Sequence, residues 1–140
     1  MQDPRDTHTE LPASPLALIE GIQCGYAPNV MWCAPRRGVT LMGRGKVMEY
    51  LLREAAAMQD LQITRLRCNC SDVQIIDEFV ARFRYSGEGI EGVELPAGAA
   101  VELERLRILT LTNKRITLET SIERWTVLDP PAPVAGSVPG

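Results

Sequence analysis

The strongest constraint on the fold is a two-residue repeat that begins after Asp60 and continues to residue 128. Along this stretch apolar and polar residues alternate, as they do in a strand that buries one face. Four strands are predicted, at residues 61–70, 73–85, 99–111 and 115–128. The three residues between the last two strands predict a tight turn, and the glycine-rich residues 86–98 predict a longer connection.

Before Asp60 the repeat is helical. Residues 46–58 predict the clearest helix, because their apolar side chains fall on one face. These are Val47, Tyr50, Leu51, Ala55 and Met58. A weaker helix is predicted to start at Ser14-Pro15, and residues 30–34 predict a short strand that ends in a turn. Helices followed by strands, without alternation of the two, predict an α+β fold with an antiparallel sheet.

The length of 140 residues suits one domain, which we assign to residues 14–128, between a polar arm (1–13) and a proline- and glycine-rich tail (129–140). A net charge of −3 gives no general attraction to nucleic acid or anionic lipid. No apolar run approaches the roughly 20 residues of a membrane-spanning helix, and the N-terminus lacks a secretory signal. We therefore expect a cytoplasmic protein without nucleic-acid or membrane partners.

No metal and no cofactor is predicted. Four cysteines in a chain without a leader are expected to stay reduced. Cys68 and Cys70 share one strand face but lack a second pair of ligands, and the single histidine, His8, lies in the arm. The glycines before the helix, Gly43 and Gly45, lack the spacing of a phosphate-binding loop.

Strand parity assigns the two faces of the sheet. The inner face, which we expect to meet the helices, carries Phe79, Phe83, Val101 and Leu103. The solvated face carries opposite charges on neighbouring strands, Arg82 and Arg84 against Glu102 and Glu104. This outer face also carries apolar residues that predict a homodimer interface, Leu106, Ile108 and Trp125.

The same parity places two charged residues on the inner face, Asp77 and Arg105, which are the candidate catalytic residues. Inside an apolar cavity Arg105 would hold a carboxylate or an oxyanion, and Asp77 would serve as a general base. Burial of either charge alone is costly. The alternatives are therefore an internal ion pair between Asp77 and Arg105, or a position of each near a strand end that reaches solvent.

The candidate wall of a ligand pocket consists of Trp32, Tyr50, Phe79, Phe83, Leu103, Leu118 and Ile122. The last two follow from parity in the final strand, where Leu118, Thr120 and Ile122 are expected to face inward, and Glu119 and Glu123 outward. The alternative is that the aromatic residues are ordinary core. Tyr50 differs, because a buried hydroxyl needs a partner and is able to address a ligand.

Three segments match a known pattern in their order and spacing. They are Ala27-Pro-Asn-Val-Met-Trp32 with Pro35, Met42-Gly-Arg-Gly-Lys46, and Leu95-Pro-Ala-Gly98 with Arg115-Ile-Thr-Leu-Glu-Thr-Ser121. Together they resemble NTF2-like proteins of the SnoaL and ketosteroid-isomerase type over residues 14–128. The resemblance implies a cone-shaped fold, in which a strongly curved sheet wraps over helices around one mostly apolar cavity. It also implies frequent dimerisation through the outer sheet face.

The resemblance allows the chemistry to be checked by position. The general-base aspartate of steroid isomerases falls at Ala34, and their protonated aspartate falls at Arg105. Their oxyanion tyrosine falls in the arm before Ser14, which holds no tyrosine. Steroid-isomerase chemistry is therefore not expected. Cyclases and epoxide hydrolases carry an acid late in the last strand, where Glu119 and Glu123 are nearby without a firm match.

Two functions stay open at this point. In the first, the domain is an enzyme of the cyclase, isomerase or epoxide-hydrolase type that acts on a small apolar organic ligand, with Arg105 as its electrostatic element. In the second, it is a non-catalytic binding or accessory module that is dimeric through the outer sheet face.

Overall fold

The computed structural model describes residues 25–128. The predicted arm and tail, the helix expected from Ser14, His8 and Cys24 lie outside the described residues. No helix among the residues that are described is both long and apolar enough to cross a membrane.

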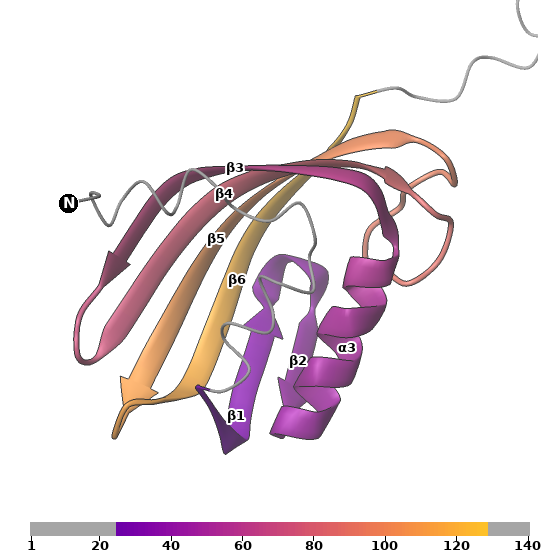
Figure 1. Ribbon diagram of the computed structural model, residues 1–140. Coiled ribbons are helices and arrows are strands. Elements are labelled where there is room, and N and C mark those ends of the chain that lie inside the picture. Colours follow the sequence, from indigo (N-terminus) through magenta and orange to yellow (C-terminus); the bar gives the residue numbers. More distant parts are fainter. Residues whose placement is uncertain (1–24, 129–140) are drawn as a thin grey trace, which may run out of the picture.

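Six strands form one sheet in the order β2-β1-β6-β5-β4-β3. They are β1 (Tyr26–Ala34), β2 (Val39–Met42), β3 (Met58–Cys70), β4 (Gln74–Tyr85), β5 (Ala100–Thr112) and β6 (Arg115–Val127). All neighbours pair antiparallel except β1 and β6, which are parallel. A short 3-10 helix, η1 (Pro35–Arg37), joins β1 to β2, and the α-helix α3 (Arg44–Ala56) precedes β3. In Figure 1 the long strands curve over α3, which lies on the concave side.

These elements confirm the predicted α+β fold. The four long strands begin and end within three residues of their predicted limits, and α3 begins two residues earlier than predicted. Met58 starts β3 instead of ending the helix, because Ala57 terminates α3 and the chain turns directly into the sheet. The short strand β2 was not predicted, since four residues give too little alternation for a strand to be recognised.

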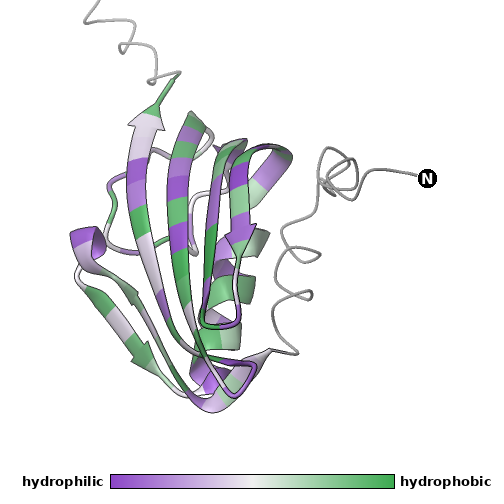
Figure 2. Ribbon diagram, turned by 90° about the vertical axis from the view of Figure 1, so that its left-hand side faces the viewer, coloured by the Kyte–Doolittle hydropathy of each residue, from purple (hydrophilic) through white to green (hydrophobic). Residues whose placement is uncertain are grey.

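Two apolar clusters form the core. In the first, α3 packs on β1 through Val47, Tyr50 and Leu51 against Val30 and Trp32. In the second, residues of β3, β4, β5 and the loop between β4 and β5 pack together. This cluster contains the predicted inner-face residues Phe79, Phe83, Val101 and Leu103. Figure 2 shows the alternation of hydrophilic and hydrophobic residues along the strands that produces this packing.

Between the two clusters the inner face is polar. Along β5, Val101 and Leu103 belong to the second cluster and Leu109 to the first, whereas the two inward residues between them are Arg105 and Arg107. Both arginines are buried. The fold therefore encloses a charged band between two apolar regions.

The predicted faces of β6 were wrong. Glu119, Ser121 and Glu123 are buried on the inner face, and Leu118 and Ile122 lie on the outer face. The cause is a register shift, at which β6 advances from Ile116 to Leu118 while β5 moves by one residue, from Leu111 to Thr110. An extra residue in one strand reverses the parity of everything beyond it.

The outer face combines charged pairs with an apolar centre. Arg82 contacts Glu102 at 2.9 Å as predicted, but Glu104 pairs with Arg124 at 2.7 Å rather than with Arg84. The apolar centre contains Ile76, Leu106, Ile108, Leu118 and Ile122, all of them half-buried. Trp125 is not part of it. Its ring packs edge-on against Phe83 on the inner side, with the centroids 6.3 Å apart.

Candidate functional site

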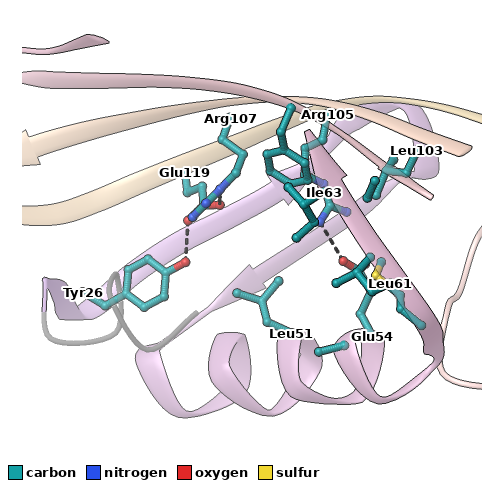
Figure 3. A pocket seen from close by; sticks show the side chains of 13 residues that line it. Tyr26, Leu51, Glu54, Leu61, Ile63, Leu103, Arg105, Arg107 and Glu119 are labelled. Atoms are coloured by element: carbon teal, nitrogen blue, oxygen red, sulfur yellow. Dashed lines mark hydrogen bonds and ion pairs between the residues drawn. The ribbon is translucent and has the colours of Figure 1, made fainter. Parts of the chain in front are cut away.

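A cavity lies between α3 and the inner face of the sheet (Figure 3). Most of its wall is apolar and includes Leu51, Met58, Leu61, Ile63, Phe79 and Leu103. The polar part of the wall consists of Tyr26, Glu54, Arg105, Arg107 and Glu119. About 50 Å³ is open to the centre of a water molecule, which is room for several waters or for one end of a small organic molecule.

Tyr26, Glu119 and Arg107 form one polar end of the cavity. The Tyr26 hydroxyl donates to Oε1 of Glu119, and Nε of Arg107 donates to Oε2 at 2.9 Å (Figure 3). Nη1 of Arg107 donates to Oδ2 of Asp77 at 3.2 Å, and Asp77 also pairs with Arg65 at 3.2 Å. Three strands, β1, β5 and β6, therefore bring a phenol, a guanidinium and a carboxylate together.

The ionisation states at this end follow from burial and from neighbouring charges. Burial alone would raise the pKa of Glu119, but Arg107 and the hydroxyl of Tyr26 outweigh it and lower that pKa below its ordinary value. Burial, with the neighbouring Glu119 charge, raises the pKa of Tyr26. At neutral pH the site therefore holds a carboxylate that accepts from a protonated phenol.

A second polar group, at the other end, is a ring of four ionised residues, Arg37, Glu54, Arg105 and Glu123. Arg105 contacts Glu54 at 2.8 Å and Glu123 at 2.7 Å, and Arg37 contacts the same two glutamates at 3.1 and 2.7 Å. Although burial opposes ionisation of Glu123, Arg105 and Arg37 lower its pKa to about 2. Arg105 is therefore a structural partner of two carboxylates as well as a residue of the cavity wall.

Three aromatic side chains surround Arg37 of this ring. The Arg37 guanidinium lies 5.8, 5.7 and 5.3 Å from the ring centroids of Trp32, Tyr50 and Trp125, respectively. Its Nη1 also donates to the Tyr50 hydroxyl at 2.8 Å, which provides the partner that this buried hydroxyl needs. Tyr50 is thus committed to Arg37.

The structure places the predicted site residues as follows. Arg105 lines the cavity, and Asp77 is buried one contact away, behind Arg107. The ion pair expected between Asp77 and Arg105 is absent from the described residues, because each has other partners. Whether either residue takes part in catalysis stays a prediction.

Of the predicted pocket wall, Phe79 and Leu103 line the cavity. Trp32 and Tyr50 pack on each other in the first core cluster, with their centroids 5.3 Å apart, and Phe83 lies in the second cluster. Leu118 and Ile122 lie on the outer face and do not line this cavity. Contact of any of these residues with a ligand stays a prediction.

Sequence reasoning missed Tyr26, Arg37, Glu54 and Arg107, and it considered Glu119 but assigned it to the outer face. Arg107 could have been predicted, because it lies two residues beyond Arg105 on the same strand face. Glu54 could also have been predicted, since it follows Leu51 by three residues on the buried stripe of α3. The inward position of Glu119 could not, because the register shift in β6 reverses its parity.

Among residues 25–128, no group of three or more histidine, cysteine, aspartate or glutamate side chains is arranged to hold a metal ion. Cys33, Cys68 and Cys70 are free thiols.

No protein-family model and no curated protein matches the chain, but many solved structures do. An NTF2-like protein of unknown function from Cytophaga hutchinsonii aligns with a TM-score of 0.59 at 14% identity, over 75% of this chain and 84% of its own. A putative SnoaL-like polyketide cyclase from a Jannaschia species aligns with a TM-score of 0.60 at 9% identity, over 74% and 70%. An LEH-like epoxide hydrolase from M. tuberculosis aligns with a TM-score of 0.56 at 12% identity, over 86% and 80%.

At identities this low, the structural alignments establish the architecture and leave the activity open. The architecture is the one that the sequence motifs predicted, and the chain has the NTF2-like fold shared by SnoaL-like and ketosteroid-isomerase-like proteins.

Proposed function

We propose that this domain binds a small, largely apolar organic molecule in the cavity and that Glu119 removes a proton from it. The observation that supports the proposal is the position of Glu119 on a mostly apolar wall, between the hydroxyl of Tyr26 and the guanidinium of Arg107. Perturbed ionisable groups that converge in an apolar pocket are typical of active sites. Two structural neighbours, a putative cyclase and an epoxide-hydrolase-like protein, support the general class.

The proposed step is abstraction of a proton from a carbon next to a carbonyl group. The proton moves to Glu119, the electrons of the C–H bond form a carbon–carbon double bond, and the π electrons of the carbonyl group move to its oxygen, which gives an enolate. Because its pKa is lowered, Glu119 is a weaker base than a free carboxylate. The reaction therefore depends on Arg107, whose positive charge stabilises the enolate oxygen. Return of the proton completes an isomerisation or exchange.

In this proposal the predicted catalytic pair acts through its neighbours. Asp77 orients Arg107 by accepting from Nη1, and so would be a positioning residue. Arg105 holds Glu54 and Glu123 in place and contributes its charge at the far end of the cavity wall.

Binding is tested by adding small cyclic ketones, ethers and alcohols to the full chain and recording the changes in its NMR chemical shifts. We expect shifts at cavity residues that disappear in Ala55→Leu, since Ala55 lines the cavity and the added side chain would fill it. The matched control is Ala56→Leu, the next residue of α3, whose side chain is exposed. Shifts that persist in Ala55→Leu would place binding elsewhere.

Catalysis is tested by deuterium exchange of the α-hydrogens of cyclohexanone in D₂O, which needs no knowledge of the natural substrate. A positioned general base contributes roughly 10²–10⁴-fold to such a step. We expect exchange above the buffer rate in the wild type and its loss in Glu119→Gln. Exchange that is unchanged in the variant would remove Glu119 from the mechanism.

The second candidate function is a non-catalytic, dimeric binding module. The observation that favours it is the complete pairing of the acids around the cavity, together with the apolar centre of the outer face. Ligand binding without any deuterium exchange would favour this function over the first.

A further inference from the structure

The charges around the cavity point to the class of ligand that it accepts. Four charged residues line the wall, two arginines (Arg105, Arg107) and two glutamates (Glu54, Glu119). Each arginine contacts one of these glutamates, at 2.8 Å for Arg105 with Glu54 and at 2.9 Å for Arg107 with Glu119. The wall therefore carries no net charge.

The residues behind the wall are balanced in the same way. Glu123 and Arg37 complete the ring around Arg105, and Asp77 and Arg65 complete the group around Arg107. Both groups contain as many guanidinium as carboxylate groups. Within these two groups of described residues, no guanidinium is in excess to attract an anionic ligand.

A charged ligand would upset this balance. A carboxylate in the cavity would compete with Glu119 and Glu54 for guanidinium groups that are already bonded. The displaced glutamate would keep only its second partner, the Tyr26 hydroxyl for Glu119 or Arg37 for Glu54, and a buried carboxylate that loses a charge partner in this way is destabilised. An ammonium group would displace an arginine from its glutamate with the same consequence.

The wall nevertheless offers a hydrogen-bond donor. Nε and Nη1 of Arg107 donate to Glu119 and Asp77, which leaves Nη2, and the Tyr26 hydroxyl lies beside the same guanidinium. Arg107 is 7% exposed and lines the cavity. Its partner in the cavity would be an uncharged acceptor, such as the oxygen of a ketone or an ether.

We propose that the cavity selects an uncharged ligand with an acceptor oxygen that bonds to Arg107, and that it excludes carboxylates through the charge balance of its own wall. This inference rests on the proposed function, because it specifies the ligand class of the same cavity. It is independent of whether the ligand is transformed.

The test compares two probes of similar shape, cyclohexanone and cyclohexanecarboxylate, by NMR titration of the full chain at pH 7. For the wild type we expect cyclohexanone to bind at least about tenfold more tightly than the carboxylate. In Glu119→Gln one guanidinium charge loses its match, so the affinity for the carboxylate should rise at least about tenfold and the preference should reverse. Equal affinities in the wild type, or no gain in the variant, would overturn the inference.

The control is Glu102→Gln, which removes one negative charge from the outer face, where Glu102 pairs with Arg82. It should leave both affinities unchanged, and a gain for the carboxylate there would attribute the effect to overall charge and overturn the inference. If circular dichroism shows that Glu119→Gln is unfolded, Glu54→Gln removes the other carboxylate of the wall and carries the same expectation. If no uncharged probe shifts the cavity residues of the wild type, the proposed function itself fails, whereas equal binding of both probes defeats only the selectivity.

Discussion

Arg105 and Glu123 are direct partners across strands β5 and β6, and Nη2 of Arg105 donates to Oε2 of Glu123 at 2.7 Å with both side chains buried. Without further charged partners, this pair would be buried against the apolar residues of the inner face. Arg37 and Glu54 close a ring around it, so that each charge has two opposite charges as neighbours. Buried ionic groups of this kind are stable only when their hydrogen bonds are satisfied together.

The first prediction concerns acid stability. The folded-state pKa of Glu123 is about 2, against an ordinary value of 4.5, so its ionised form stabilises the fold above that ordinary value. As the pH falls from about 4.5 towards 2, the unfolded chain takes up the proton first, and about 3 kcal/mol of stability should be lost. Urea unfolding at pH 6, 4, 3 and 2 measures this loss. Glu123→Gln should show a shallower pH dependence, and parallel curves for the two proteins would contradict the assignment.

The second prediction concerns the ring itself. Arg105→Met leaves Glu54 and Glu123 with a single shared arginine and should lower the free energy of unfolding by about 3–5 kcal/mol. The double variant Arg105→Met/Glu54→Gln restores the charge balance and should be more stable than the single variant. Urea unfolding of both provides the comparison.

The control for the ring is Arg82→Met, which breaks the outer-face pair with Glu102 and should cost less than about 1 kcal/mol. Glu54→Gln is measured alone as well. If the loss of stability in the double variant equals the sum of the losses in Arg105→Met and Glu54→Gln, the ring members act independently.

The strands could be predicted from the sequence because their alternation is long and regular. Phe79 and Phe83 lie four residues apart in one strand and Val101 and Leu103 two apart in the next, and the structure buries all four. The parity of β6 could not be predicted in the same way. The extra residue between Ile116 and Leu118 leaves no mark in the composition, and only the pairing with β5 reveals it.

The candidate site was predicted in part for a related reason. Hydrophobic patterning assigns polar residues to the outside, so Glu119 and Glu123 were placed in solvent and Leu118 and Ile122 in the pocket. In this fold their positions are exchanged, because four arginines neutralise four acids inside the sheet. Charge pairing over long sequence distances, such as Arg37 with Glu123, cannot be read from local periodicity.

The third prediction concerns the loop that joins β4 to β5. Gly89 has a φ of +106°, and a Cβ built there would lie 2.8 Å from the backbone oxygen of Arg53 at the end of α3. Gly89→Ala should therefore lower the melting temperature, since both the backbone and the contact are unfavourable. Gly45→Ala is the matched control, because this helical glycine has open space around it and alanine favours the helix by up to about 1 kcal/mol. A tolerated Gly89→Ala would mean that the loop packs less closely on α3.

The fourth prediction concerns the homodimer, which rests on the apolar centre of the outer face around Leu106. At micromolar concentration we expect a mass of twice 15.5 kDa in analytical ultracentrifugation. Leu106→Glu buries a charge in the interface, so it should produce monomers with an unchanged circular dichroism spectrum. Leu52→Glu introduces the same side chain at an exposed leucine of α3, on the other side of the sheet, and should leave the dimer intact. A wild-type chain that sediments as a monomer, or a dimer that survives Leu106→Glu but not Leu52→Glu, would assign the interface to another surface.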